Sequence, residues 1–346
     1  MILNYVDILG KKVGDGNLPY IISEIGVNFR TLEEGKKLID ASISAGADSV
    51  KIQTFKAENL ASKNAIFDLP HMGKQSQYEI FKELEIPENI QCDLFAYAEK
   101  KKIVFFSTPS DKFDVNFLES VGIKIYKIGS DDANNIPLLE YVSQLKKPTI
   151  ISTGMCNMEE VEQIKDVFSS YENDKLILLH CVTKYPTEPQ FVNLNAMNSM
   201  KQKLNIPVGY SDHSVGIEIC KAAISLGANV IEKHITSDKN QKGPDHILSA
   251  TPNELSEIVE FSKLFYLSMG NGLKKPATCE EFTRKESRKS IVASIDIPKG
   301  IVLTSDMLRM KRPGYGIPPN YFKELIGKVT KSEIKKDQLF NWSDVN

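Results

Sequence analysis

The chain has 346 residues, enough for one large domain and a smaller one. Its 43 Lys and Arg residues nearly balance its 45 Asp and Glu residues, giving a formal net charge of −2 at pH 7. This balance excludes a global electrostatic basis for binding nucleic acid or an anionic membrane. An anionic ligand must therefore be held by a local cluster of basic residues.

The cysteines and the apolar runs bear on location. Five cysteines are scattered along the chain without a C-x-x-C pair, and an odd, scattered set favours reduced thiols over a disulfide framework. No apolar run approaches the ~18 residues of a membrane span. The N-terminus lacks the basic and apolar regions of a signal peptide. We therefore expect a cytoplasmic protein without a membrane or nucleic-acid partner.

Short apolar runs alternate with amphipathic helical patterns from about residue 19 onward. The predicted strands are 19–26, 49–55, 103–110, 125–130, 148–154, 175–183, 207–214 and 230–236. The predicted helices include 31–45, 88–102, 157–172, 216–226 and 251–269. Continuous apolar strands are typical of a parallel sheet buried on both faces, and eight βα units over ~250 residues predict a (β/α)8 TIM barrel. A doubly wound open sheet is the alternative, disfavoured because no glycine fingerprint for phosphate binding is present.

The pattern predicts a second, smaller domain after the barrel. We expect the barrel to occupy residues 1–270, with a glycine-rich hairpin at 1–18 capping one end. Residues 271–288 are polar and charged, as in a linker. Residues 289–346 alternate short apolar runs with turns, which predicts a small β-rich domain.

Two lysines interrupt predicted strands of the barrel. Lys51 and Lys127 lie within apolar runs, where burying an unpaired ammonium costs several kcal/mol. In this fold the carboxyl ends of the strands carry the active site, so both lysines could converge, near Ser130 and Ser152, on one anion such as phosphate or phosphoenolpyruvate. The alternative is that each lysine pairs with a carboxylate of the core.

Two histidines end neighbouring predicted strands. His213 and His234 follow the seventh and eighth strands, and neighbouring strands lie ~5 Å apart, so both imidazoles could reach one ion. Two nitrogens plus water suit octahedral Mn²⁺, with Mg²⁺ or Co²⁺ as alternatives, better than closed tetrahedral zinc. Glu24 and Glu232 also end strands. They are interpreted either as partners of the lysines or as groups for sugar binding and proton transfer.

Several motifs in register resemble bacterial sialic acid synthases. They are ISEIGVN at 22–28, AGADSVKIQTF at 45–55, YKIGS at 126–130, ISTGM at 151–155, GYSDHSVGI at 209–217, IEKHIT at 231–236 and GPDH at 243–246. The tail, with SIVA at 290–293 and KRPG at 311–314, resembles the antifreeze-like (SAF) domain of the same enzymes. The resemblance covers nearly the whole chain.

The resemblance implies an enzyme that condenses phosphoenolpyruvate, water and an open-chain N-acetylmannosamine-type aldehyde into a nine-carbon 2-keto acid, N-acetylneuraminate, and phosphate. It implies that His213 and His234 bind the metal and that Glu24 and Arg312 are catalytic. Phosphate and carboxylate binding map onto Lys51, Lys127, Ser130, Ser152 and Ser211. Binding of the sugar maps onto Gln53, Tyr185 and Asp245 together with Glu24, and we assign Thr183 and Glu232 to the substrate as well. Arg312 is expected to enter the active site of a neighbouring subunit, which implies a domain-swapped homodimer.

The acceptor sugar stays open at this point. Phe29 stands where the family motif has His, and Thr183 stands where one neuraminate synthase pattern has Asn, both at positions expected to contact the sugar. A legionaminic or pseudaminic acid synthase using a di-acetamido hexose is therefore the main alternative. A synthase of eight-carbon keto acids and a non-catalytic carbohydrate-binding protein are the more distant ones.

Overall fold

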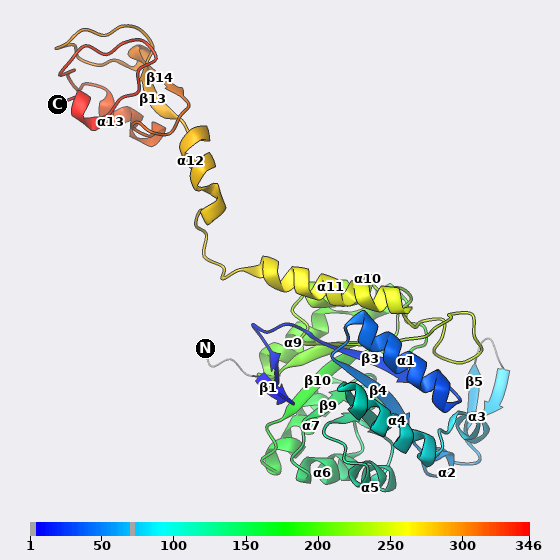
Figure 1. Cartoon of the computed structure of the whole chain (residues 1–346). Helices are drawn as coiled ribbons and strands as arrows, with labels where there is room; N and C mark the ends of the chain where they lie inside the picture. The colour runs from blue at the N-terminus through cyan, green and yellow to red at the C-terminus, as the bar shows by residue number, and fades with distance from the viewer. Residues whose placement is uncertain (1–4, 70–72) are drawn as a thin grey trace. The chain divides into compact units, whose positions relative to one another are not determined.

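The computed structural model describes residues 5–69 and 73–346. It separates into two compact units, Met1–Gly270 and Asn271–Asn346, each of which is described by itself (Figure 1). Residues 1–4 of the expected N-terminal hairpin lie outside the described residues. Within the part of the chain that is described, no helix is both long and apolar enough to cross a membrane.

The first unit is a closed barrel of eight parallel strands, which confirms the predicted TIM barrel and excludes the open sheet. Around the barrel the strands run in the order β10-β11-β12-β3-β4-β7-β8-β9. Their bounds are β3 Tyr20–Gly26, β4 Ser49–Thr54, β7 Val104–Pro109, β8 Tyr126–Ile128, β9 Thr149–Ser152, β10 Leu176–Cys181, β11 Val208–Asp212 and β12 Val230–His234. The strands are shorter than predicted because their terminal polar residues, such as Ser130 and Thr183, already belong to the following turns.

Helices follow the strands around the outside of the barrel (Figure 1). The main ones are α1 Leu32–Ala45, α4 Glu88–Lys101, α5 Lys112–Ser120, α6 Ile136–Gln144, α7 Met158–Ser170, α9 Asn195–Leu204, α10 Glu218–Ser225 and α11 Pro252–Met269. Capping boxes at Thr31, Asn157 and Thr251 begin α1, α7 and α11, satisfying backbone N–H groups that would otherwise lack partners. The apolar faces of these helices and the strands form one continuous core.

Two hairpins and three short helices complete this unit. The hairpin of β1 Tyr5–Ile8 and β2 Lys11–Gly14 turns at Leu9 and Gly10, both with positive φ. A second hairpin, β5 Ile66–Leu69 with β6 Gly73–Ser76, lies between α2 Ala57–Leu60 and α3 Gln77–Leu84. The last short helix is α8 Pro189–Val192, after β10.

The second unit has its own small core. β13 Ser290–Ala293 pairs antiparallel with β14 Leu308–Lys311, and isolated bridges connect the other extended segments, with α13 at Phe322–Leu325. Ten buried apolar residues, from Ile291 to Val345, form the core. The segment expected as a polar linker is partly helical, with a 3₁₀ turn at Thr278–Glu280 and α12 at Glu281–Ser287. The sequence does not predict this helix, because residues 281–287 lack the spaced apolar positions of an amphipathic helix. In the structure α12 accordingly buries no residue.

Candidate active site

The carboxyl ends of β3, β4 and β7 bring together one acid and one base. Lys51 Nζ lies 2.7 Å from Glu24 Oε2, and both side chains are almost fully buried. The same ammonium donates to the Thr108 hydroxyl at 2.8 Å. Gln53 donates from Nε2 to Glu24 Oε1 at 3.2 Å, so Lys51 and Gln53 share one side of β4 as their alternation requires. Lys51 therefore pairs with a buried carboxylate, as the alternative interpretation of this lysine expects.

A second acid and base lie across the barrel mouth, on β8, β9, β11 and β12. Lys127 donates to Ser152 Oγ at 2.6 Å and to the Ile128 carbonyl at 2.7 Å. Its Nζ is 3.9 Å from Glu232 Oε1, a looser pairing than that of Lys51. Ser211 donates to the same Glu232 oxygen at 3.1 Å, while Glu232 Oε2 is buried without a hydrogen-bond partner. Lys127 and Glu232 therefore keep polar capacity that a ligand can use.

The residues that follow β8, β9 and β10 pack closely together. The Gly154 backbone N–H donates to Ser130 Oγ at 2.9 Å. A Cβ at Gly154 would lie 2.2 Å from Thr183 Oγ1 and 2.8 Å from Ser130 Oγ, distances that only glycine avoids. Three chain segments thus approach so closely that two hydroxyls and a backbone amide share one small space.

The two carboxylates at the mouth differ in their electrostatic surroundings. Burial raises the pKa of Glu24 to about 7, because the nearby Lys51 charge only partly offsets the loss of water and the Glu232 charge adds repulsion. Burial acts on Glu232 too, yet Lys127 and Lys51 together keep its pKa below the ordinary value. Burial lowers the pKa of Lys127. The cluster therefore favours an ionised Glu232, whereas Glu24 can take up or release a proton near neutral pH, the separation of acid and base that enzymes use.

The two histidines lie side by side with an aromatic ring beside them. The ring centroids of His213 and His234 are 5.6 Å apart, and the Tyr185 ring lies 4.1 Å from that of His213. His213 Nδ1 is 2.9 Å from the Val182 carbonyl, which leaves Nε2 free to face the mouth. Cys181 Sγ is 3.6 Å from His213 Nδ1. The thiol is thus a neighbour of this histidine.

These histidines fit a divalent cation. His234 Nδ1 is buried without a hydrogen-bond partner and lies 3.5 Å from Asp245 Oδ2. Burial and the neighbouring positive charges, that of His213 first among them, lower the pKa of His234 well below its usual value, so its imidazole is neutral, as a metal ligand must be. Burial opposes a charge on His213, but the Cys181 thiol and the Val182 carbonyl raise its pKa, so a metal bound there would displace a proton. Among the described residues no three His, Cys, Asp or Glu side chains are arranged to hold a metal by themselves. Water or substrate oxygens would complete the coordination, which suits Mn²⁺ better than structural zinc.

The structure corrects one sequence expectation and places two further residues, Arg30 and Thr108, near the site. Phe29 is buried in the barrel core, packed near Gly35 and Leu94, and does not reach the mouth. Burial raises the pKa of Asp245 to about 6, and the charges of His213, Lys51 and the exposed Arg30 act in the opposite direction. Thr108 was not singled out, although its place at the end of β7, opposite Gln53, was a usable signal.

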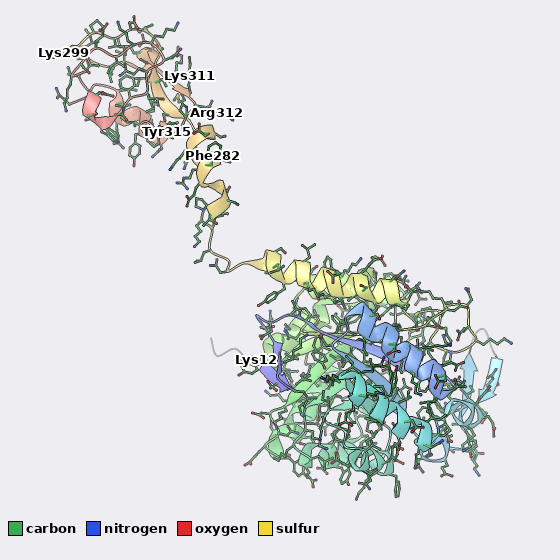
Figure 2. The ribbon with its side chains drawn as sticks, in the orientation of Figure 1. Lys12, Phe282, Lys299, Lys311, Arg312 and Tyr315 are labelled. Carbon is green, nitrogen blue, oxygen red and sulfur yellow. The ribbon has the colours of Figure 1, made fainter. Side chains whose placement is uncertain are left out.

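Arg312 lies in the second unit, at the end of β14. Figure 2 shows it near Tyr315, and its side chain is exposed. Within this unit Gly314 and Tyr315 attach the turn to α12. The Gly314 N–H donates to the Lys285 carbonyl at 2.6 Å, and the Tyr315 hydroxyl hydrogen-bonds Glu286. Across the described residues Arg312 makes no hydrogen bond or ion pair. A free guanidinium on an anchored turn is available to bind another molecule.

The sequence pattern of the NeuB family matches residues 38–274, and that of the SAF domain matches residues 288–346. The chain belongs to the NeuB family. It is therefore an enzyme, a transferase of the synthase type, with a SAF domain after its barrel.

Named relatives and a solved structure agree with this membership. The N,N'-diacetyllegionaminic acid synthase of Campylobacter jejuni is 40% identical, over 92% of this chain and 98% of that protein. The human N-acetylneuraminate-9-phosphate synthase is 35% identical, over 95% of this chain and 93% of that protein. The crystal structure of the N-acetylneuraminic acid synthetase of Leptospira borgpetersenii is 33% identical, with a TM-score of 0.74 over 81% of this chain and 95% of that chain.

Proposed function

We propose that this NeuB-family enzyme condenses phosphoenolpyruvate with an N-acetylated amino sugar and water, giving a nine-carbon 2-keto acid and phosphate. The observation that carries the proposal is the convergence of two buried lysines, two buried carboxylates and two neighbouring histidines at one barrel mouth. A phosphorylated carboxylic acid needs two cationic contacts, and an aldehyde acceptor needs a proton source and an electrophilic environment.

The lysines bind the anionic co-substrate in this proposal. Lys127, with Ser152 and Ser130 beside it, takes the phosphate, because its pairing with Glu232 is loose and leaves N–H donors for a ligand. Lys51 lies closer to Glu24 and binds the carboxylate end, with Ser211 as a further polar contact. Both cations are almost fully buried, so a contact to an anion there is weakened little by water or salt.

The carboxylates move protons in this proposal. The enol carbon of phosphoenolpyruvate forms a bond to the aldehyde carbon, and the aldehyde oxygen takes up a proton, for which the protonated Glu24 is suited. Water then adds to the carbon that bears the phosphate oxygen. The ionised Glu232 can accept one proton from that water. The carbon–oxygen bond to phosphate then breaks, phosphate leaves with the electron pair and the remaining proton of the added hydroxyl, and the hydroxyl oxygen becomes the keto oxygen.

The histidines hold a divalent ion in this proposal, Mn²⁺ in the first place, with Mg²⁺ or Co²⁺ as alternatives. When bound, such an ion supplies Lewis-acid polarisation of a carbonyl. Tyr185 stacks beside His213 and, with Asp245, forms the side of the mouth that would contact the sugar. Gln53 hydrogen-bonds Glu24, and the exposed Thr183 lies beside Gly154 and Ser130.

Two acceptors are supported by different relatives. The human and Leptospira proteins are named for N-acetylneuraminate products, which favours N-acetylmannosamine or its phosphate. The Campylobacter protein is named for a diacetylated legionaminic acid, which favours a di-acetamido hexose. We also propose that the enzyme works in the cytoplasm, since all five cysteines are free. A domain-swapped homodimer, in which Arg312 serves the partner's site, completes the proposal.

Phosphate release tests the proposal. Purified enzyme with Mn²⁺ and phosphoenolpyruvate should release phosphate only when an amino-sugar acceptor is added. The acceptor panel holds N-acetylmannosamine, its 6-phosphate and the di-acetamido hexose, and the acceptor that gives the highest kcat/KM is assigned. Phosphate release that does not depend on any amino sugar, or no release with every acceptor, would show the proposed reaction to be wrong.

A further inference from the structure

The two histidines at the barrel mouth are each preceded in sequence by a charged residue that faces away from the mouth. Asp212 ends β11 immediately before His213, and Lys233 precedes His234, the last residue of β12. Side chains alternate across a strand, so these charged residues point outward, toward α10, while the histidines point to the mouth. Asp212 and Lys233 are also opposite each other in the parallel register of β11 and β12.

The pair is fully buried and hydrogen-bonded on all sides. Lys233 Nζ lies 2.6 Å from Asp212 Oδ2, and both side chains are 0% exposed. The same ammonium donates to the Ser214 carbonyl at 2.6 Å, so it holds the chain on the far side of His213 as well. Asp212 Oδ1 accepts from the Ser214 backbone N–H at 3.1 Å and from the Ser214 hydroxyl at 2.8 Å.

Further contacts attach the pair to the neighbouring elements. Cys220 on α10 donates from Sγ to Asp212 Oδ2 at 3.3 Å, and the Tyr210 hydroxyl donates to Oδ1 at 3.2 Å. The backbone carbonyl of His213 accepts from Thr187 N–H at 2.9 Å. The turn that carries His213 is therefore fixed on both sides, by the Asp212–Lys233 pair and by the segment after β10.

Stability alone does not account for an ion pair in this place. A buried ion pair is often no more stabilising than a well-packed apolar pair of the same volume, because desolvation offsets the attraction. What the ion pair adds is directional geometry: one ammonium joins β12 to residues on both sides of His213. A shift of one strand along the other would break both contacts of Lys233.

We propose that Asp212 and Lys233 are positioning residues that fix the spacing of the His213 and His234 imidazoles and thereby set the affinity of this site for a divalent cation. The inference rests on the metal part of the proposed function. Neither residue touches the substrate or the cation. Both act through the histidines that follow them, since the pair determines where the ends of β11 and β12 lie relative to each other.

The test is a titration of the protein with Mn²⁺ alone, in which electron paramagnetic resonance measures the concentration of free ion and so gives the dissociation constant. The main variant, Asp212→Leu with Lys233→Met, removes both charges together and so leaves no uncompensated buried ion. A second variant, Asp212→Asn with Lys233→Gln, keeps a neutral hydrogen-bonded pair and carries the test if the first does not fold. Groups that orient metal ligands typically contribute ~10- to 100-fold to metal affinity, and we expect a loss of that size in the folded variants.

A matched control separates positioning from general loosening of the barrel. Thr54→Val with Gln91→Leu removes another buried polar pair, joined at 2.6 Å between β4 and α4, and should keep the Mn²⁺ affinity of the wild type. The Michaelis constant for phosphoenolpyruvate should change less than the Mn²⁺ affinity in the Asp212 and Lys233 variants, because its two proposed cationic contacts, Lys51 and Lys127, lie on β4 and β8.

The outcomes distinguish the proposed metal site from the proposed positioning role of Asp212 and Lys233. If the wild type binds Mn²⁺ no more tightly than His213→Ala, the metal part of the proposed function is wrong, and the inference fails with it. If the wild type binds through His213 but a folded Asp212–Lys233 variant binds equally well, only the positioning role is wrong. Weaker binding in the Thr54 and Gln91 control, equal to that of the pair variants, would also overturn the specific role.

Discussion

Lys51 Nζ lies 2.7 Å from Glu24 Oε2 in an almost fully buried ion pair, whereas Lys127 Nζ is 3.9 Å from the corresponding carboxylate oxygen of Glu232. The barrel mouth therefore holds one tight and one loose pairing. Lys127 donates instead to the Ser152 hydroxyl and the Ile128 carbonyl, and an anionic oxygen can replace or supplement these contacts. This asymmetry makes Lys127 the better test of co-substrate binding.

Replacing Lys127 with Met should raise the Michaelis constant for phosphoenolpyruvate far more than that for the amino sugar. A charge-assisted contact contributes ~1.5–3 kcal/mol, which corresponds to roughly 10- to 100-fold. Steady-state kinetics with each substrate varied in turn measure the effect. Lys203→Met, which removes an exposed lysine paired with Glu162, is the control and should leave both constants unchanged. Equal increases for both substrates in Lys127→Met would contradict the assignment.

Replacing His213 or His234 with Ala should abolish metal-dependent turnover while the barrel stays folded. Both buried rings contact one another at the mouth and lie outside the apolar core cluster, so their loss removes the proposed metal ligands and leaves that cluster intact. Activity after chelation and re-addition of Mn²⁺ gives the measurement, with circular dichroism to check folding. His180→Gln is the matched control, because His180 hydrogen-bonds the Val192 carbonyl, away from this pair of rings. Full activity of either alanine variant, or of chelated wild type, would contradict the metal site.

Mixing two inactive variants should restore activity if Arg312 serves a partner's active site. A dimer of one Arg312→Ala chain and one His213→Ala chain contains one barrel with His213 intact, which receives an intact Arg312 from the other chain. Arginine suits this role because its planar guanidinium binds carboxylate or amide oxygens through paired hydrogen bonds. Activity is measured after subunit exchange has been verified by native mass spectrometry.

The control for this experiment is a mixture of His213→Ala and His234→Ala chains. Every barrel in such a dimer carries one defect, so no activity should return. If the Arg312→Ala and His213→Ala mixture also stays inactive after verified exchange, Arg312 does not act in the partner's site. The helical residues 278–287 limit how far the connecting segment extends, since a helix rises only ~1.5 Å per residue.

The stability of the barrel should fall as the pH rises from the acidic range to neutrality because of Asp114 on α5. Burial and the nearby Asp111 charge raise the pKa of Asp114 from 3.8 to about 7. A carboxyl with a raised pKa in the folded state stabilises the fold below pH 3.8, and this contribution is lost as the pH rises through about 7. Asp114→Asn cannot ionise and still accepts the backbone N–H groups of Ser110 and Asp111.

Thermal unfolding of the wild type and Asp114→Asn at about pH 5 and about pH 8 checks this expectation. The melting temperature of Asp114→Asn relative to the wild type should be higher at the alkaline value than at the acidic one. Asp93→Asn, which replaces an exposed carboxylate on α4, should show no such pH-dependent difference. The same difference for both variants would contradict a special role of Asp114.

Several residues of the site could be placed from the sequence because strand position limits where a side chain can lie. Lys51 and Gln53, two residues apart on β4, were expected on one side of that strand, and both contact Glu24. The meeting of His213 and His234 was expected from two adjacent strand ends, and their rings are neighbours. Phe29 was wrongly expected at the sugar, because the turn after β3 directs it into the core under α1, which the motif alone does not reveal.

Patterns in the sequence predict the barrel and the chemical groups at its mouth. Eight βα units with apolar strands favour a closed barrel over an open sheet, and the polar ends of such parallel strands lie on one rim. The tertiary structure decided which groups pair and which stay free: Lys51 with Glu24, Lys233 with Asp212, and Lys127 only loosely with Glu232. These pairings follow from nitrogen–oxygen distances of 2.7, 2.6 and 3.9 Å, respectively, between side chains on different strands. Periodicity in a single strand cannot specify such distances, because they follow from the closure and packing of the whole barrel.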